Sequence, residues 1–175
     1  MNDTATGAYA APTACNLSKS EIESLAVAVA ETFEYQPGSD LRPIVRAMGG
    51  EIEIHDLSGS SSGSIEMWPE GFCISLPLHT GPLRDRFTIA HELGHWVLHY
   101  VGVGADENGG PMIATRYGTG RVETEANWFA AAFLMPNEEF RGAWRRHSGD
   151  LSVVADIFGV SEAAATVRAE ALSLI

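Results

Sequence analysis

FTIAHELGHWVLH, residues 87–99, places three histidines and a glutamate within nine positions of an otherwise apolar segment. Its spacing predicts a helix over about 84–100. At about 100° per residue, His95 lies roughly 40° and Glu92 roughly 100° from His91, so the polar groups form one stripe. Apolar side chains fill the rest of the circumference. We therefore expect a helix that is surrounded by core and turns its polar stripe toward a functional site.

The HExxH pattern in this helix indicates a metal site. Histidines four residues apart stack on one side of a helix, so both can bind one tetrahedral ion at about 2.0 Å. Glu92 then lies where it can accept a proton from a water that the metal activates. The alternative is a core helix with hydrogen-bonded histidines, but burying these groups without partners costs roughly 2 kcal/mol or more each. The pattern favours one zinc ion with His91 and His95 as ligands.

His99 is the remaining histidine of the stripe. In an unbroken helix it lies about 12 Å along the axis from His91, so the two cannot share one ion. Residues 96–98 contain no glycine turn that could fold the chain back toward the metal. We therefore expect His99 to support the ligands or the structure rather than to bind the metal.

A third ligand has to come from another element, and the helix expected at about 121–134 offers one. Glu123 falls between apolar side chains on the buried face of this helix, where a carboxylate is costly unless it is paired or binds a metal. Glu125 points elsewhere, and Asn127 is placed to hydrogen-bond a ligand histidine or the ligand carboxylate. In the alternative interpretation, Glu123 only stabilises the N-terminus of its helix.

The remaining patterns predict an α+β fold in one domain, residues 17–175, after a disordered tail at 1–16. A small three-stranded sheet with a hairpin around residues 69–71 is expected to pack against the histidine helix, and a C-terminal helical bundle follows. Residues 101–120 are rich in glycine and predict a long loop. A first helix is expected to begin with a capping box, formed by Ser18 and Glu21 or by Ser20 and Glu23, and to end before Pro37. Further helices are expected at about 40–48 (capped by Ser39), 137–146, 150–158 and 161–172, and strands at 51–57, 65–68 and 72–77.

Composition restricts the function classes. The net charge of −12 disfavours contact with nucleic acid, which requires clustered cations. Residues 150–175 have a helix-turn-helix rhythm but contain a single arginine, Arg168, among four acids, so we interpret them as a packing unit or a surface for a protein partner. Two cysteines without metal or disulfide spacing, no apolar span and no signal-like start predict a cytoplasmic location and no membrane contact.

Three segments resemble the ImmA/IrrE family of zinc metallopeptidases. RFTIAHELGHWVLH (86–99) is similar to its active-site helix, ETEANWFAAAFLMP (123–136) to its second signature, and VADIFGVSEAAATVRAEAL (154–172) to its C-terminal helices. The resemblance implies a zincin-like fold with His91, His95 and Glu123 as zinc ligands, a water as fourth ligand and Glu92 as the catalytic glutamate. It also implies that the substrate is a helix-turn-helix transcriptional repressor, expected here as a separate polypeptide.

The mechanism expected from these residues is metal-assisted hydrolysis of a peptide bond. The family resemblance implies that this cleavage would relieve repression in a stress response or a mobile element. A non-catalytic alternative is a zinc-stabilised protein that binds and sequesters the repressor. A DNA-binding regulator is a third reading, which the charge disfavours. An oxyanion donor is also expected, without a ranking among the candidates. These candidates are Tyr100, Tyr117, Arg116, Arg121 and His79.

Overall fold

The computed structural model describes residues 9–56, 63–105, 110–115 and 120–175. Its helices are α1 (Lys19–Thr32), α2 (Arg42–Ala47), α3 (Pro82–Gly94), the π-helix η1 (His95–Val101), α5 (Arg121–Leu134), α6 (Asn137–Arg146), α7 (Leu151–Phe158) and α8 (Glu162–Ala171). Its strands are β1 (Gly50–His55), β2 (Ser64–Trp68), β3 (Gly71–Pro77) and β4 (Met112–Thr115). This arrangement confirms the predicted α+β class.

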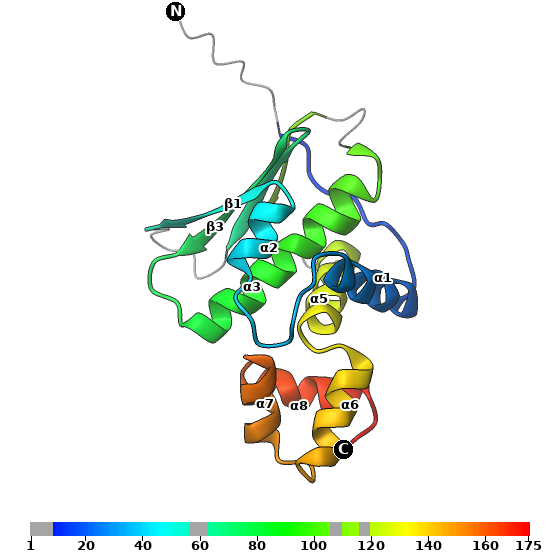
Figure 1. Ribbon diagram of the computed structural model, residues 1–175. Helices are drawn as coiled ribbons and strands as arrows, with labels where there is room; N and C mark the ends of the chain where they lie inside the picture. The colour runs from blue at the N-terminus through cyan, green and yellow to red at the C-terminus, as the bar shows by residue number, and fades with distance from the viewer. Residues whose placement is uncertain (1–8, 57–62, 106–109, 116–119) are drawn as a thin grey trace, which may run out of the picture.

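The long helix formed by α3 and η1 lies at the centre of the molecule. The sheet and α2 lie on one side of it, and α5 and α1 on the other (Figure 1). Helices α6, α7 and α8 form a separate group below the end of α5, in the place of the predicted C-terminal bundle. The central helix is thus enclosed by core, as its apolar circumference predicts.

The sheet is mixed, with strand order β1-β3-β2-β4. β2 and β3 form the predicted antiparallel hairpin, and β1 joins β3 in parallel. On β2 the side chains of Ile65 and Met67 are buried, because alternate residues of a strand face the same side. The connection predicted between the first two strands lies largely outside the described residues, as does residue 57.

β4 is a fourth strand that the sequence analysis missed. It lies within residues 101–120, which were predicted to be a loop, and pairs antiparallel with β2. Four residues are too few to show a period of two among glycines, so only the tertiary pairing and the burial of Met112 and Ala114 reveal the strand. Ala10 bridges to Met112 on its other side, so part of the segment predicted as a tail contacts the sheet. Residues 1–8 lie outside the described residues, and the domain division stays a prediction.

Local capping explains several helix starts. Ser18 and Glu21 form the capping box of α1, one of the two predicted pairs. Asp150 caps α7 and Ser161 caps α8. The predicted cap Ser39 is wrong for α2, because that helix begins after Leu41 and no side chain caps it.

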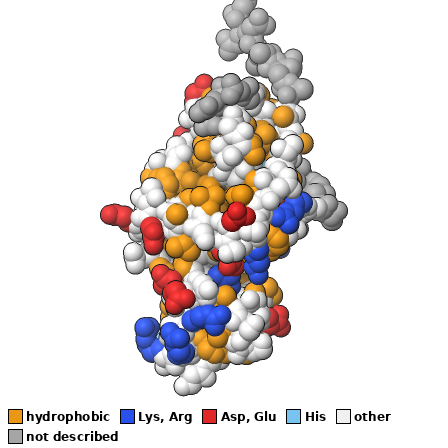
Figure 2. Space-filling model, turned by 90° about the vertical axis from the view of Figure 1, so that its right-hand side faces the viewer, with side chains coloured by type: hydrophobic (Ala, Val, Ile, Leu, Met, Phe, Trp, Pro, Cys, Tyr) orange, Lys and Arg blue, Asp and Glu red, His pale blue; other side chains and the backbone are white. Residues whose placement is uncertain are grey.

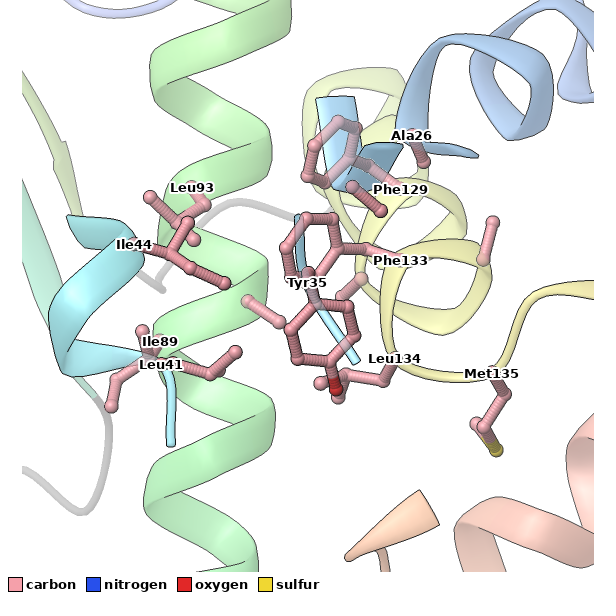
Figure 3. Close-up of a cluster of buried hydrophobic side chains, with 14 of the residues drawn as sticks. Ala26, Tyr35, Leu41, Ile44, Ile89, Leu93, Phe129, Phe133, Leu134 and Met135 are labelled. Atoms are coloured by element: carbon pink, nitrogen blue, oxygen red, sulfur yellow. The ribbon is translucent and has the colours of Figure 1, made fainter. Parts of the chain in front are cut away.

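The core between α3 and α5 fixes the distance between the two helices. In this core, Ile89 and Leu93 of α3 lie beside Leu41 and Ile44, and Phe129 and Phe133 of α5 lie beside Tyr35 (Figure 3). At Gly94 the backbones come so close that an added Cβ would lie 3.1 Å from Ala126 Cα and 3.2 Å from Ala126 O. The glycine of HELGH thus lets α5 approach the histidine helix.

The C-terminal helices are tied to the rest of the chain by a buried arginine. Arg168 of α8 is 3% exposed; its Nε donates to Met135 O at 2.9 Å and its Nη1 to Glu23 Oε1 at 2.7 Å. Its charge is therefore used within the fold, in agreement with the interpretation of these helices as a packing unit.

In the face seen in Figure 2, hydrophobic side chains are exposed between acidic and basic ones. None of the described helices is long and apolar enough to cross a membrane.

Candidate metal centre

The histidines lie where α3 continues into the π-helix η1. The sequence predicted one unbroken α-helix, whereas from His95 onward the backbone adopts the wider π form, a feature often found at functional sites. Gly102 N donates to Val97 O at 2.9 Å and closes this segment. A Cβ on Gly102 would lie 2.8 Å from that same oxygen, so the turn requires glycine. Apolar periodicity does not distinguish the two helix types over so short a segment.

The structure brings His91, His95 and Glu123 together. His91 Nε2 lies 3.2 Å from His95 Nε2 and 3.1 Å from Glu123 Oε2. His95 Nε2 lies 3.4 Å from Glu123 Oε1. Both histidine side chains are 1% exposed and that of Glu123 is 15% exposed, so the cluster is buried rather than on the surface. We call these three residues the ligand triad.

Hydrogen bonds behind the rings determine which nitrogens carry protons. His91 Nδ1 donates to Asn127 Oδ1 at 2.9 Å, which is one of the two contacts predicted for Asn127. His99 Nε2 donates to Glu125 Oε2 at 3.0 Å, leaving His99 Nδ1 to accept from His95 Nδ1 at 3.0 Å. Burial, together with the neighbouring His95, lowers the pKa of His99, so this ring is neutral near pH 7.

The electrostatics of Glu123 fit this picture. Burial raises the pKa of its carboxyl, but hydrogen bonds and charge interactions with His91 and His95 outweigh burial and lower the pKa to about 2. Glu123 is therefore ionised at neutral pH. A carboxylate can only accept, so it offers lone pairs to the same point as the two Nε2 atoms.

The ligand triad fits a tetrahedral cation. Bonds of about 2.0 Å in tetrahedral geometry separate neighbouring ligand atoms by about 3.3 Å. The three measured separations, 3.1, 3.2 and 3.4 Å, agree with this value. With both Nδ1 atoms bonded away from the cluster, the two Nε2 atoms and the carboxylate converge on one point, where a cation can replace the protons that hydrogen-bond to Glu123. The donor set of two imidazoles and one carboxylate is typical of catalytic zinc.

Glu92, the predicted catalytic glutamate, follows His91 on α3 and is 1% exposed. The backbone of Gly63, just before β2, covers this part of the helix. A Cβ on Gly63 would lie 2.5 Å from Thr88 Cγ2, 2.9 Å from Ser75 O and 3.7 Å from Glu92 Oε1. The sheet and the helix are thus in close contact beside the glutamate, and a side chain at residue 63 would intrude there.

Glu125 is the site residue that the sequence analysis missed. It is fully buried, although the helical wheel placed it away from the ligand face. The wheel considers one helix alone, whereas His99 and the chain at Cys15 and Asn16 enclose Glu125 from outside α5. Two features of the sequence could have indicated Glu125: Arg121 lies one turn before it on the same helix, and His99 had no assigned partner.

The oxyanion candidates differ in their placement. Tyr100 is buried, and its hydroxyl donates to Gly110 O at 3.5 Å. Arg121 pairs with Glu125 and its guanidinium lies over the ring of Trp128, while His79 is exposed. Arg116 and Tyr117 lie outside the described residues.

The HExxH helix packs between a small mixed sheet and a second helix, which carries the acidic donor Glu123. This arrangement defines a zincin-like metallopeptidase fold. Residues 46–170 match the IrrE N-terminal-like domain family of peptidases, and the chain belongs to this family. The predicted family resemblance is thereby confirmed.

A solved structure supports the fold. The chain is similar to a Mycobacterium tuberculosis transcriptional regulator, with a TM-score of 0.61 and 19% sequence identity. The similarity covers 85% of this chain and 46% of the regulator, so the chain spans about half of the regulator's length. None of the curated proteins matches the chain significantly.

Proposed function

We propose that the protein is a zinc-dependent endopeptidase whose metal is held by His91, His95 and Glu123. The observation that carries the proposal is the convergence of two imidazole nitrogens and a carboxylate at separations of 3.1–3.4 Å, close to those that tetrahedral zinc requires. Membership in a peptidase family supports hydrolysis as the reaction.

The chain's own residues supply the rest of the chemistry. A zinc ion held by His91, His95 and Glu123 would polarise the scissile carbonyl and lower the pKa of a water toward about 7. Glu92 accepts the proton of the attacking water and passes it to the leaving amine. Its burial, at 1% exposure, keeps bulk water from competing for that proton transfer. Asn127 and His99 hold the ligand rings in orientation from behind.

We infer that the substrate is a helix-turn-helix transcriptional repressor, and that cleavage relieves repression. The family resemblance supports this substrate class, and the similar M. tuberculosis structure is described as a transcriptional regulator. Charge supports a protein partner of this type, because a chain of net charge −12 attracts basic surfaces such as those of DNA-binding proteins. The same charge disfavours direct binding to DNA. We place this activity in the cytoplasm, where such repressors act.

The test is to incubate the zinc-loaded protein with a panel of purified helix-turn-helix repressors and to measure product masses. The proposal predicts defined fragments with wild type and none with Glu92→Gln, which keeps the fold and the zinc. A stable complex with an intact repressor would instead indicate a sequestering protein. Fragments that persist with Glu92→Gln would remove Glu92 from the mechanism.

A further inference from the structure

A second group of donor atoms lies directly behind the ligand triad. Cys15 Sγ, His99 Nε2 and an oxygen of Glu125 lie within 4.8 Å of one another, and His99 and Glu125 are both fully buried. The group joins three parts of the chain that are distant in sequence: the segment before α1, the π-helix η1 and the first turns of α5. The sequence analysis assigned a role only to His99.

The contacts of Glu125 satisfy both of its carboxylate oxygens without a cation. Its Oε1 accepts from Arg121 Nε at 2.7 Å and from the backbone N–H of Asn16 at 3.0 Å. Its Oε2 accepts from His99 Nε2 and the backbone N–H of Cys15, both at 3.0 Å, and from the Cys15 thiol at 3.3 Å. A carboxylate has about four lone-pair sites. Five donors occupy them in this structure.

We propose that Glu125 and His99 are positioning residues that set the metal affinity of His95, an inference that rests on the proposed function. Glu125 can only accept, which fixes the His99 proton on Nε2 and leaves His99 Nδ1 to accept from His95 Nδ1. His95 is thereby held with Nδ1 protonated and with Nε2 directed toward Glu123 and His91, the form that metal binding requires. We call the chain of hydrogen bonds from Glu125 through His99 to His95 the relay. The backbone N–H groups of residues 15–16 hold Glu125 in place, although they lie outside the segment that matches the family.

The two ligand histidines therefore have different supports. The amide of Asn127 orients His91, whereas an ionised carboxylate orients His95 through a second imidazole. A carboxylate behind a ligand imidazole raises its basicity more than an amide does, and loss of such a group weakens metal binding about 10- to 100-fold. The metal affinity of the triad thus depends on residues far from the HExxH motif.

The first test measures the tautomer directly in the metal-free protein. Two-bond 1H–15N correlation spectra near pH 7.5 report which nitrogen of each histidine is protonated. The proposal predicts His95 protonated on Nδ1 in wild type and a mixture of tautomers in His99→Phe, which fills the space without accepting a hydrogen bond. His99→Asn keeps an acceptor oxygen near the position of Nδ1 and should restore the wild-type tautomer. An unchanged tautomer in His99→Phe would overturn the proposal.

The second test measures zinc affinity by competition with a chromophoric chelator. We expect His99→Phe to bind zinc about 10- to 100-fold more weakly, with His99→Asn and Glu125→Gln between it and wild type. Cobalt substitution should still give the absorption bands of a tetrahedral site in His99→Phe, because no ligand is lost. Leu98→Ala, a buried neighbour on η1, is the matched control: it should lower the melting temperature but keep zinc affinity.

The outcomes separate this inference from the proposed function. If His91→Ala and Glu123→Ala bind zinc as tightly as wild type, the ligand triad itself is overturned. If those two variants lose zinc but His99→Phe binds it as tightly as wild type, only the positioning role of His99 and Glu125 is overturned. A second zinc per chain that disappears with Cys15→Ser would also overturn the relay, because it would make Glu125 a ligand.

Discussion

Replacing Glu125 by glutamine tests how strongly the buried relay stabilises the fold. Burial raises the pKa of this carboxyl, but hydrogen bonds from Arg121, His99 and Cys15 outweigh it and lower the pKa to about 2 from the ordinary value of 4.5. A group whose pKa is depressed on folding stabilises the protein above its unfolded pKa. At about 1.36 kcal/mol per pKa unit, the ionised carboxylate contributes about 3 kcal/mol at pH 7.

The sign of the pH dependence follows from the same shift. The contribution is complete above about pH 5 and decreases as the pH falls from about 4.5 toward 2, where the folded protein also takes up the proton. Urea denaturation of the metal-free protein should therefore show Glu125→Gln destabilised by about 3 kcal/mol at pH 7 and by about 1 kcal/mol at pH 3. The exposed Glu31→Gln serves as the control for loss of one charge. A difference that is below about 0.5 kcal/mol, or the same at both pH values, would refute the reasoning.

Three further substitutions test separate contacts. Gly63→Ala should destabilise the fold by about 1–3 kcal/mol in chemical denaturation, because its Cβ overlaps Thr88 and the Ser75 carbonyl; wild-type stability would contradict that packing. Arg168→Met should cost about 2–4 kcal/mol by leaving Glu23 unpaired, with zinc content unchanged, and an unaffected melting curve would argue against the buried pair. Asn127→Ala should weaken zinc binding roughly 10-fold in a chelator competition, and an unchanged affinity would show that the bond to the ligand histidine is dispensable.

The sequence predicted the parts of the fold that depend on local periodicity. The histidine helix, the α5 helix and the β2–β3 hairpin carry clear patterns, and the α+β class followed from them. β4 has only four residues and is defined by its pairing with β2, so nothing local distinguishes it from a loop. The π-helical geometry from His95 onward could not be predicted from the sequence either, because it changes the backbone hydrogen bonds without changing the apolar pattern.

Those residues of the candidate site whose position follows from the face of a single helix could be predicted from the sequence. Placing Glu123 on a buried face led to its expected position beside His91, and the structure brings the two together. Glu125 was missed because its burial comes from other elements, η1 and the segment before α1. Contacts between elements that are distant in sequence are set by tertiary packing, which a single helical wheel does not contain.

The central claim is that His91, His95 and Glu123 hold one zinc ion. Metal analysis of the purified protein by mass spectrometry, together with zinc titration of the metal-free protein, tests it most directly. The account predicts one zinc per chain in wild type, and loss of that zinc with His95→Ala and with Glu123→Ala while both variants remain folded. Wild-type protein that takes up no zinc, or a Glu123→Ala variant that binds it as tightly as wild type, would contradict the account.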